Sequence, residues 1–181
     1  MNQNAATPHP NINSEFAFDW APREALGEPV FAVEGNRFRV VYDPDDRIDA
    51  AIRLIEQAQI SVRAFYYMVR DDESGARLLQ AMRDAVARGV TVSLGIDGFG
   101  SNDTAVAWFE EQTKDSIDFF IFSSRRSMRA LIRNHQKMLI IDGDQSGDVE
   151  LISGFNITDY YFGMKGAESW ADMGMVVAGP A

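Results

Sequence analysis

The 181-residue sequence contains no cysteine, which excludes disulfide bonds, thiolate nucleophiles and cysteine-ligated metals. The absence leaves the compartment open, because a chain without cysteine suits oxidising and reducing surroundings alike. Histidine is nearly as scarce, since only His9 and His135 occur. His9 lies among prolines in a stretch predicted to be a disordered tail, so His135 is the one histidine available for chemistry.

Long apolar runs are also absent. No stretch of about 18 apolar residues occurs, which predicts that nothing in this chain spans a membrane. The N-terminus lacks the basic and then apolar layout of a signal peptide. Any membrane contact is therefore expected to be peripheral or to be supplied by sequence that this chain lacks.

Positive charge is in short supply over the chain as a whole. Seventeen Lys and Arg residues stand against 27 Asp and Glu, a formal net charge of −10. An acidic surface repels nucleic acid phosphates, so a nucleic acid partner is not expected. One stretch reverses this balance, as either a solvated basic loop or a funnel that draws an anionic headgroup toward His135. Between residues 123 and 137 it holds five basic residues and no acidic one: Arg125, Arg126, Arg129, Arg133 and Lys137.

Strand-like and helical patterns alternate from residue 37 onward. This alternation predicts a single α/β layered domain over residues 37–181, with a mixed β-sheet and helices on both faces. Residues 1–36 are predicted to be a partly disordered tail and lead-in. Helices are expected at about 46–59, 74–88 and 104–112, and strands at about 37–42, 60–67, 90–96, 117–122, 135–141, 149–153 and 173–178.

The most informative stretch begins at His135, which opens an apolar run. Lys137 follows two residues later, so on a strand the two side chains would project from the same face. The run ends at Asp142 in a turn-like pair, and a second short apolar segment ends at Ser153, three residues before Asn156. Two strands joined by a polar loop would bring a nucleophile or base, a cation and two neutral hydrogen-bonding groups to one end of a sheet. These groups suit a phosphate.

The pattern His135-x-Lys137-x-x-x-x-Asp142, followed by Ser153-Gly-Phe-Asn156, resembles the HKD signature of the phospholipase D superfamily. From about Phe38 to the C-terminus the chain is similar to the first half of a bacterial cardiolipin synthase. Members carry two such motifs in one chain, or one motif per subunit of a dimer, and this chain has one. The resemblance therefore implies a phospholipase D-like fold whose second half is absent. The flanking segments that carry it are Ala85-Val-Ala-Arg-Gly-Val-Thr-Val, the turn at residues 97–101, Gly154-Phe-Asn-Ile157 and Trp170-Ala-Asp172.

The resemblance also implies a role for each polar residue of the motif. His135 would attack the phosphodiester phosphorus and form a phosphohistidine, or would be the acid if the two halves exchange roles. Lys137 would supply positive charge to the phosphate oxygens. Ser153, Asn156 and Arg133 would bind the substrate.

Two carboxylates remain. The signature counts Asp142 among the catalytic residues, but strand parity turns it away from His135, which favours a role in supporting the strand end. Asp172 is the candidate partner that would hold the second ring nitrogen of His135. No metal or other cofactor is expected, because lysine and histidine already do the work of a cation.

Three functions remain open on the sequence. The first is a phosphatidyltransferase of the cardiolipin synthase type, acting on a phospholipid such as phosphatidylglycerol, in the cytoplasm or peripherally on the bacterial inner membrane. The second is a single-motif phosphodiesterase or nuclease that completes its site as a homodimer. The third is an inactive half that binds anionic lipid. Acidity and the flanking segments favour the first over the second.

Overall fold

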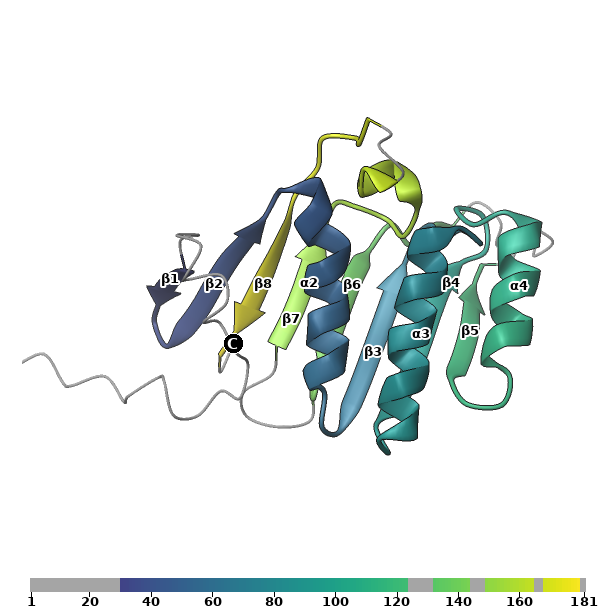
Figure 1. Cartoon of the computed structure of the whole chain (residues 1–181), viewed down its shortest axis with the longest axis horizontal. Coiled ribbons are helices and arrows are strands. Elements are labelled where there is room, and N and C mark those ends of the chain that lie inside the picture. The colour runs from purple at the N-terminus through teal and green to yellow at the C-terminus, as the bar shows by residue number, and fades with distance from the viewer. Residues whose placement is uncertain (1–29, 124–131, 144–148, 165–167, 180–181) are drawn as a thin grey trace, which may run out of the picture.

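The computed structural model describes residues 30–123, 132–143, 149–164 and 168–179. In the described residues, eight strands form one mixed sheet in the order β1-β2-β8-β7-β6-β3-β4-β5 (Figure 1). β3, β4 and β5 run parallel to one another, and every other neighbouring pair is antiparallel. The strands are β1 (Val30–Val33), β2 (Asn36–Val41), β3 (Ser61–Tyr66), β4 (Thr91–Asp97), β5 (Asp118–Phe122), β6 (Lys137–Ile141), β7 (Val149–Ser153) and β8 (Gly174–Ala178).

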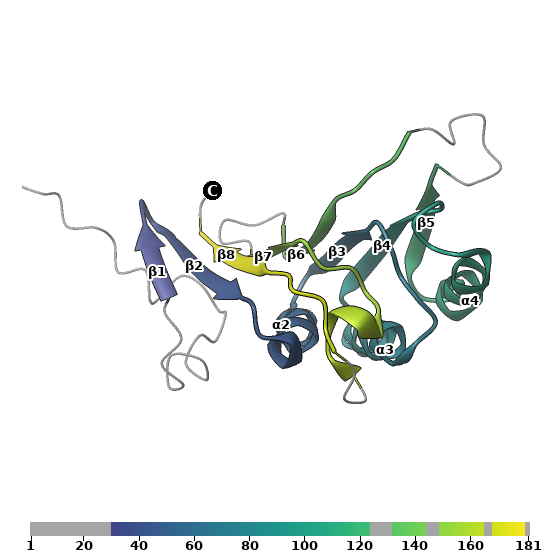
Figure 2. The same cartoon turned by 90° about the horizontal axis from the view of Figure 1, so that it is seen from above.

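The described α-helices are α2 (Pro44–Gln57), α3 (Glu73–Ala87) and α4 (Asp103–Thr113), and Asp159–Tyr161 form the short 3-10 helix η2. All three α-helices cover the same face of the sheet (Figure 2). The predicted α/β layered class and mixed sheet are confirmed, but the described helices do not lie on both faces as predicted. The opposite face also carries apolar side chains, such as Phe120 and Ile152, each 48% exposed, so the strand sequences did not indicate which face the helices leave uncovered.

Each helix begins where the sequence supplies an acceptor for its free backbone N–H groups. Asp43 accepts a hydrogen bond from the N–H of Asp45 at the start of α2, where Pro44 takes the first helical position. Asp72 caps α3 and Asn102 caps α4 in the same way. The predicted helix starts near residues 46, 74 and 104 are thus confirmed to within two residues.

The core lies between the helices and the sheet. Leu54 of α2 and Leu78 of α3 pack over Val62, Leu94 and Leu139 of the central strands, and all five side chains are fully buried. Burial of such side chains supplies most of the driving force for folding. The core therefore holds β3, β4 and β6 rigidly side by side.

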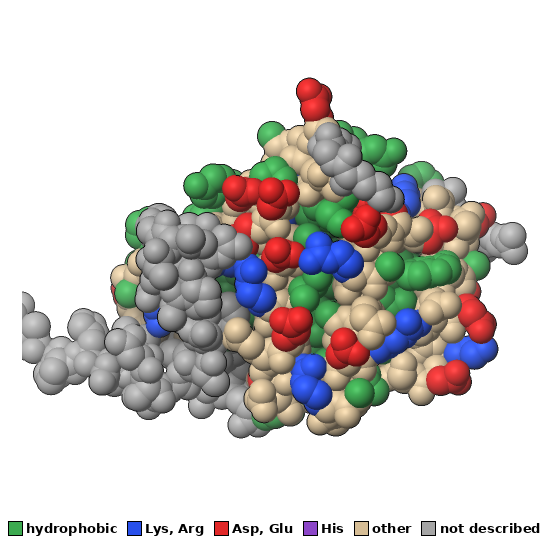
Figure 3. All heavy atoms as spheres, in the orientation of Figure 1, with side chains coloured by type: hydrophobic (Ala, Val, Ile, Leu, Met, Phe, Trp, Pro, Cys, Tyr) green, Lys and Arg blue, Asp and Glu red, His purple; other side chains and the backbone are tan. Residues whose placement is uncertain are grey.

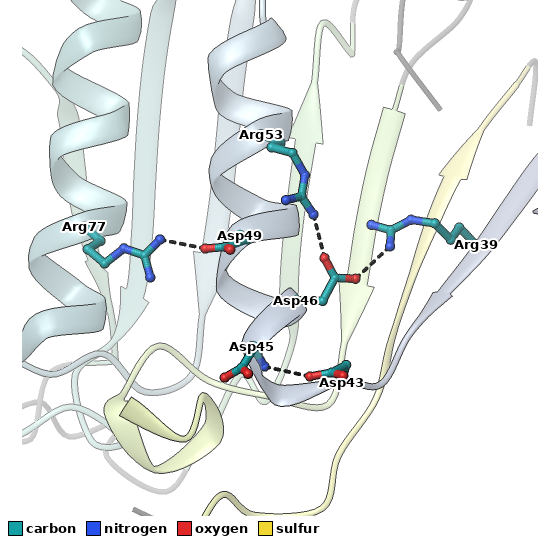
Figure 4. Close-up of polar contacts among 7 residues, drawn as sticks. All are labelled: Arg39, Asp43, Asp45, Asp46, Asp49, Arg53 and Arg77. Carbon is teal, nitrogen blue, oxygen red and sulfur yellow. Dashed lines mark hydrogen bonds and ion pairs between the residues drawn. The ribbon is translucent and has the colours of Figure 1, made fainter. Parts of the chain in front are cut away.

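A buried ion pair joins β2 to α2. Arg39 donates to the Asp46 carboxylate at 2.7 Å, and Arg53 reaches the second oxygen of that carboxylate at 2.5 Å (Figure 4). The Arg39 and Asp46 side chains are 3% and 4% exposed, whereas the Arg77–Asp49 pair on the outer side of α2 is 38% and 42% exposed. Acidic and basic side chains are interspersed over the helix-covered face (Figure 3).

The N-terminal lead-in contributes to the sheet. Residues 1–29 lie outside the described residues, but Val30–Val33 pair with β2 as strand β1. Glu34 and Gly35 make the turn with positive φ angles of 49° and 88°. The sheet therefore begins seven residues earlier than the domain start predicted from the sequence.

Strand direction decides where the loops meet. β3, β4, β5 and β7 end along the same side of the sheet on which β6 and β8 begin, here called the carboxyl edge. Ligands of open α/β sheets bind outside the carboxyl ends of the strands, which is this edge. Within the described residues, no helix is both long and apolar enough to cross a membrane.

We predict that Asp46→Ala lowers the free energy of unfolding by about 3–5 kcal/mol, because the buried Arg39 charge loses that carboxylate. Asp49→Ala, on the same helix, removes a half-exposed ion pair and should cost about 0–1 kcal/mol. Urea unfolding of both variants measures the difference. Equal losses in the two variants would contradict the importance of the buried pair.

Candidate active site

The candidate site is centred on a contact between His135 and Lys137 at the edge of the sheet. Lys137 Nζ lies 3.1 Å from His135 Nδ1 and donates to the His135 carbonyl oxygen at 2.7 Å. The imidazole is exposed, whereas Lys137 is 5% exposed. The predicted strand included His135, but β6 begins at Lys137, so the lysine side chain reaches back to the histidine.

Two features around Lys137, its burial and the Asp172 carboxylate, affect its pKa in opposite directions. Burial lowers the pKa of Lys137 below its ordinary value of 10.5, and the Asp172 carboxylate opposes this effect. A lysine ammonium has three protons to donate, and the two contacts with His135 use at most two of them. The third is available to a bound anion.

Tyr67 covers the histidine ring. It follows the end of β3, and its ring centroid lies 4.4 Å from that of His135. Lys137 Nζ lies 5.5 Å from the same aromatic centroid. An aromatic face attracts a cation and restricts a neighbouring ring. Sequence analysis missed this residue, because only the pairing of β3 with β6 brings it to His135.

Ser153 and Asn156 lie at the same edge, as the sequence predicted. Met138 pairs with Ile152, and one step further along this register places Ser153 opposite Lys137. Ser153 Oγ donates to the carbonyl of Phe155 at 3.1 Å.

Asn156 is 2% exposed, and its amide already has protein partners. Its Oδ1 accepts from the N–H of Met68 at 2.9 Å, and its Nδ2 donates to the Tyr161 hydroxyl at 3.2 Å. One Nδ2 proton remains for a ligand. In this structure Asn156 thus joins the loop after β7 to the loop after β3.

Asp172 lies against the glycine of the Ser-Gly-Phe-Asn segment. A Cβ atom on Gly154 would stand 2.1 Å from Asp172 Oδ1, so only glycine allows this approach. Asp172 Oδ1 accepts from the N–H of Met173 at 2.7 Å. The structure thus places Asp172 within electrostatic reach of Lys137, whereas the sequence proposed it as the partner of the His135 ring.

Arg133 is the described member of the basic stretch that lies next to the motif. Its guanidinium stands 3.8 Å from the centroid of the Phe99 ring, and Nη1 donates to the carbonyl of Ile132. Arg125, Arg126 and Arg129 lie outside the described residues.

Asp142 is placed away from the other motif residues. It follows β6 at the end opposite His135, roughly 20 Å away at the rise of an extended strand. Its carboxylate accepts from the N–H groups of Gln59, Ile60 and Ser61 at 2.7 to 3.2 Å. These contacts support the start of β3, and the structure does not bring Asp142 to the catalytic set in which the signature counts it.

Arg47 is a further structural residue that sequence analysis missed. This buried side chain donates to four carbonyl oxygens, those of Tyr42, Tyr161, Trp170 and Asp172, at 2.6 to 2.8 Å. Burial lowers the pKa of Arg47, an effect that Asp172 and Asp43 oppose. Arg47 therefore fastens the loop that carries Asp172 to α2. An arginine in the first turn of an amphipathic helix gave no sequence signal for this role.

No cluster of three or more histidine, cysteine, aspartate or glutamate side chains that could hold a metal occurs among the described residues.

Comparison with known proteins relates the chain to lipid enzymes. A family model described as cardiolipin synthase, PLD-like domain, matches residues 51–179. The cardiolipin synthase of Listeria welshimeri is 33% identical over 161 residues, and cardiolipin synthase 1 of Staphylococcus aureus is 29% identical over 156 residues. These matches cover 86% and 83% of this chain but only 33% and 31% of the relatives. The chain thus spans about a third of the length of the curated relatives it matches.

Solved structures share the fold at lower identity. A phosphatidylserine synthase from Haemophilus influenzae Rd KW20 has a TM-score of 0.65 and 17% identity, over 90% of this chain and 39% of that chain. The phospholipase D family member Nuc from Salmonella typhimurium has a TM-score of 0.58 and 22% identity, over 80% of this chain and 84% of that chain. At these identities the likeness is one of fold.

We predict that Asp142→Ala lowers the free energy of unfolding by about 1–3 kcal/mol, because backbone N–H groups at the start of β3 lose their acceptor. Asp142→Asn keeps an acceptor oxygen and a residue that tolerates the φ of 56°, so it should lose less. The NMR signals of the His135 imidazole should remain unchanged in both variants. A shift of those signals comparable to the effect on stability would mean that Asp142 acts on the site.

Proposed function

The chain belongs to the family of cardiolipin synthase PLD-like domains, and we propose that it acts as a phosphatidyltransferase module with His135 as its nucleophile. The observation that carries this proposal is the contact between the exposed His135 imidazole and the buried Lys137 ammonium at the carboxyl edge of the sheet. A nucleophile beside a fixed positive charge is what attack on an anionic phosphodiester requires.

The first step is attack of His135 on the phosphorus of a phospholipid. His135 Nδ1 faces Lys137, so Nε2 is the nitrogen left to face the substrate, and attack from Nε2 requires the tautomer that carries the ring proton on Nδ1. The nitrogen lone pair forms a P–N bond while the bond from phosphorus to the leaving alcohol breaks. The leaving oxygen takes a proton from a second histidine, which the other half of the enzyme supplies. A phosphatidyl group then remains on His135.

In the second step an acceptor alcohol attacks the phosphohistidine. The new P–O bond forms as the P–N bond breaks, and the alcohol proton returns to the second histidine. Lys137 stabilises the negative charge on the non-bridging oxygens in both steps, because its contacts with His135 use at most two of its three protons and leave one to donate to the phosphate. The remaining Nδ2 proton of Asn156 is a further donor at this edge, whereas the single proton of the Ser153 hydroxyl is donated to the carbonyl of Phe155.

The proposed substrate is a phosphatidylglycerol-like phospholipid at the surface of a membrane. Its headgroup is anionic, and Arg133 lies two residues before the nucleophile with its guanidinium held over the Phe99 ring. Stacking on an aromatic ring keeps an arginine extended while its N–H groups stay available to phosphate. The formal net charge of −10 makes such local positive charge more important for attracting an anion.

The proposed active unit contains a second histidine from another HKD half. His135 is the only histidine among the described residues, and one imidazole cannot be both the nucleophile and the acid of the same step. A separate half or a second copy of this chain can provide it. The single-motif homodimer and the lipid-binding half remain as alternatives that the following experiment separates.

We predict that the protein mixed with phosphatidylglycerol acquires an acid-labile phosphatidyl adduct on His135, detectable by intact-mass and peptide mass spectrometry. His135→Ala should lose the adduct completely. His9→Ala, which removes the other histidine of the sequence, should retain it.

Light scattering on the same sample identifies the source of the second histidine. An adduct in a dimer supports a homodimeric active unit, and an adduct only after addition of a second HKD half supports the two-half enzyme. Binding to phosphatidylglycerol vesicles without any adduct in either arrangement would replace the enzyme by the lipid-binding half.

We also predict that the rate of adduct formation falls as the pH rises, and that this fall begins below the ordinary lysine pKa of 10.5, because burial lowers the pKa of Lys137. The same shift means that the unfolded chain binds more protons in this pH window, so Lys137 makes the folded state more stable as the pH rises. Lys137→Arg keeps its charge beyond this range and should move the decline in rate to higher pH. An unchanged decline in Lys137→Arg would assign it to another group.

A further inference from the structure

The buried carboxylate of Asp97 is the strongest feature that the proposed mechanism leaves unused. Asp97 is the last residue of β4 and is 0% exposed. Its Oδ1 accepts from the N–H groups of Phe99 and Gly100 at 2.9 and 3.1 Å. Its Oδ2 accepts from the N–H of Asn134 at 3.0 Å, across 37 residues of sequence. A buried carboxylate is costly unless such donors satisfy it, so its position is closely determined.

The fold explains why this carboxylate meets the residue before the nucleophile. In the sheet order β6-β3-β4-β5, two strands separate β5 from β6, although β5 and β6 follow one another in the sequence. Asn134 lies three residues before β6, and Asp97 binds it at the end of β4. The Asn134 side chain then accepts from the N–H of Gln136 at 3.1 Å, so the backbone is tied on both sides of His135.

The glycine-rich turn after Asp97 supports the ring of His135 through a second route. A Cβ atom on Gly100 would stand 2.1 Å from the carbonyl oxygen of Tyr67 and 3.0 Å from its ring. The turn therefore packs directly on Tyr67, whose ring lies against His135. The sequence indicated mainly a turn here, with a role at the rim of the site as the alternative, because the stretch has neither the lysine of a P-loop nor dinucleotide-binding spacing.

We propose that Asp97 is a positioning residue for His135. It binds the backbone of Asn134, and the turn that it stabilises packs through Gly100 on Tyr67, whose ring contacts His135. Asp97 does not bind the imidazole itself, and it acts through the backbone that carries His135. The catalytic part of this inference rests on the proposed role of His135 as nucleophile. The structural part, that Asp97 orients the imidazole, does not.

The test compares Asp97→Asn with Ser101→Ala. The asparagine keeps the size of the side chain but has a single acceptor oxygen, so it cannot serve both the turn and Asn134. Ser101 is a fully buried residue of the same turn, and its Oγ accepts from the N–H of Val69 at 3.1 Å. Ser101→Ala therefore removes one buried hydrogen bond of that turn without touching Asn134.

The direct readout is the imidazole itself. With only two histidines in the sequence, ¹⁵N-detected NMR assigns the His135 ring by comparison with His135→Ala. In Asp97→Asn the ring signals should move toward those of an imidazole in an unstructured peptide, because the ring moves away from the Tyr67 ring, and Tyr67→Leu should cause the same shift. Ser101→Ala should leave these signals in place. Unchanged His135 signals in Asp97→Asn, or an equal shift in Ser101→Ala, would overturn the proposal.

Catalysis gives the second readout once adduct formation is established. Asp97→Asn should lower kcat by about 100-fold with KM retained, the loss typical of a misplaced reacting group. A loss confined to KM would contradict a positioning role. If the wild type forms no adduct, the proposed function fails while the NMR comparison still decides the role of Asp97.

Hydrogen exchange on the wild-type protein guards against a variant that does not fold. The Asn134 amide should exchange at least about tenfold more slowly than the same amide in an unstructured peptide, since its N–H is bonded to a buried carboxylate. Exchange at the unstructured rate would show that the Asp97–Asn134 bond does not persist, and would overturn the proposal.

Discussion

The burial of the Lys137 ammonium is the constraint on which the rest of the site depends. A lysine at 5% exposure must find an acceptor for its protons, and it finds one in the carbonyl oxygen of His135, with Nδ1 of the same residue 3.1 Å away. The Lys137 side chain therefore reaches back along the chain to His135, whose side chain is exposed at this edge. The same burial lowers the pKa of Lys137, and the Asp172 carboxylate opposes this effect. A bound anion would stabilise the charged form of Lys137 in the same way.

Other buried polar side chains fasten the loops around this ammonium. Arg47 collects four carbonyl oxygens from the loops next to α2, and Asn156 links the loop after β7 to the loop after β3. Asp97 satisfies three backbone N–H groups at the end of β4. A buried polar side chain that loses its hydrogen-bond partners costs free energy, so each of these side chains favours the one loop arrangement that supplies its partners. Irregular loops thereby reach the precision that a reacting group needs.

Much of the fold was predictable because it follows from local patterns. Alternating side chains marked β2, β-branched and aromatic residues marked β3, and acceptors such as Asp72 marked helix starts within two residues. The arrangement of the helices on one face was not predictable, because apolar residues such as Phe120 occur on the uncovered face as well. For the site, the sequence singled out His135 and Lys137. It could not reveal Tyr67 or Asp97, which reach His135 only through neighbouring strands.

By itself the sequence determined which chemical groups the protein has and which strands carry them. One histidine outside the N-terminal tail, a lysine two residues later and no cysteine leave little choice of nucleophile and cation. Only the tertiary structure decided which groups the carboxylates contact, because the partner of a charged side chain depends on which distant backbone lies beside it. In the sequence, strand parity turned Asp142 away from His135 and left Asp172 as the candidate partner of its ring, but neither carboxylate could be placed. The pairing of β6 with β3 places Asp142 at the far end of the strand, and the loop held by Arg47 places Asp172 near Lys137.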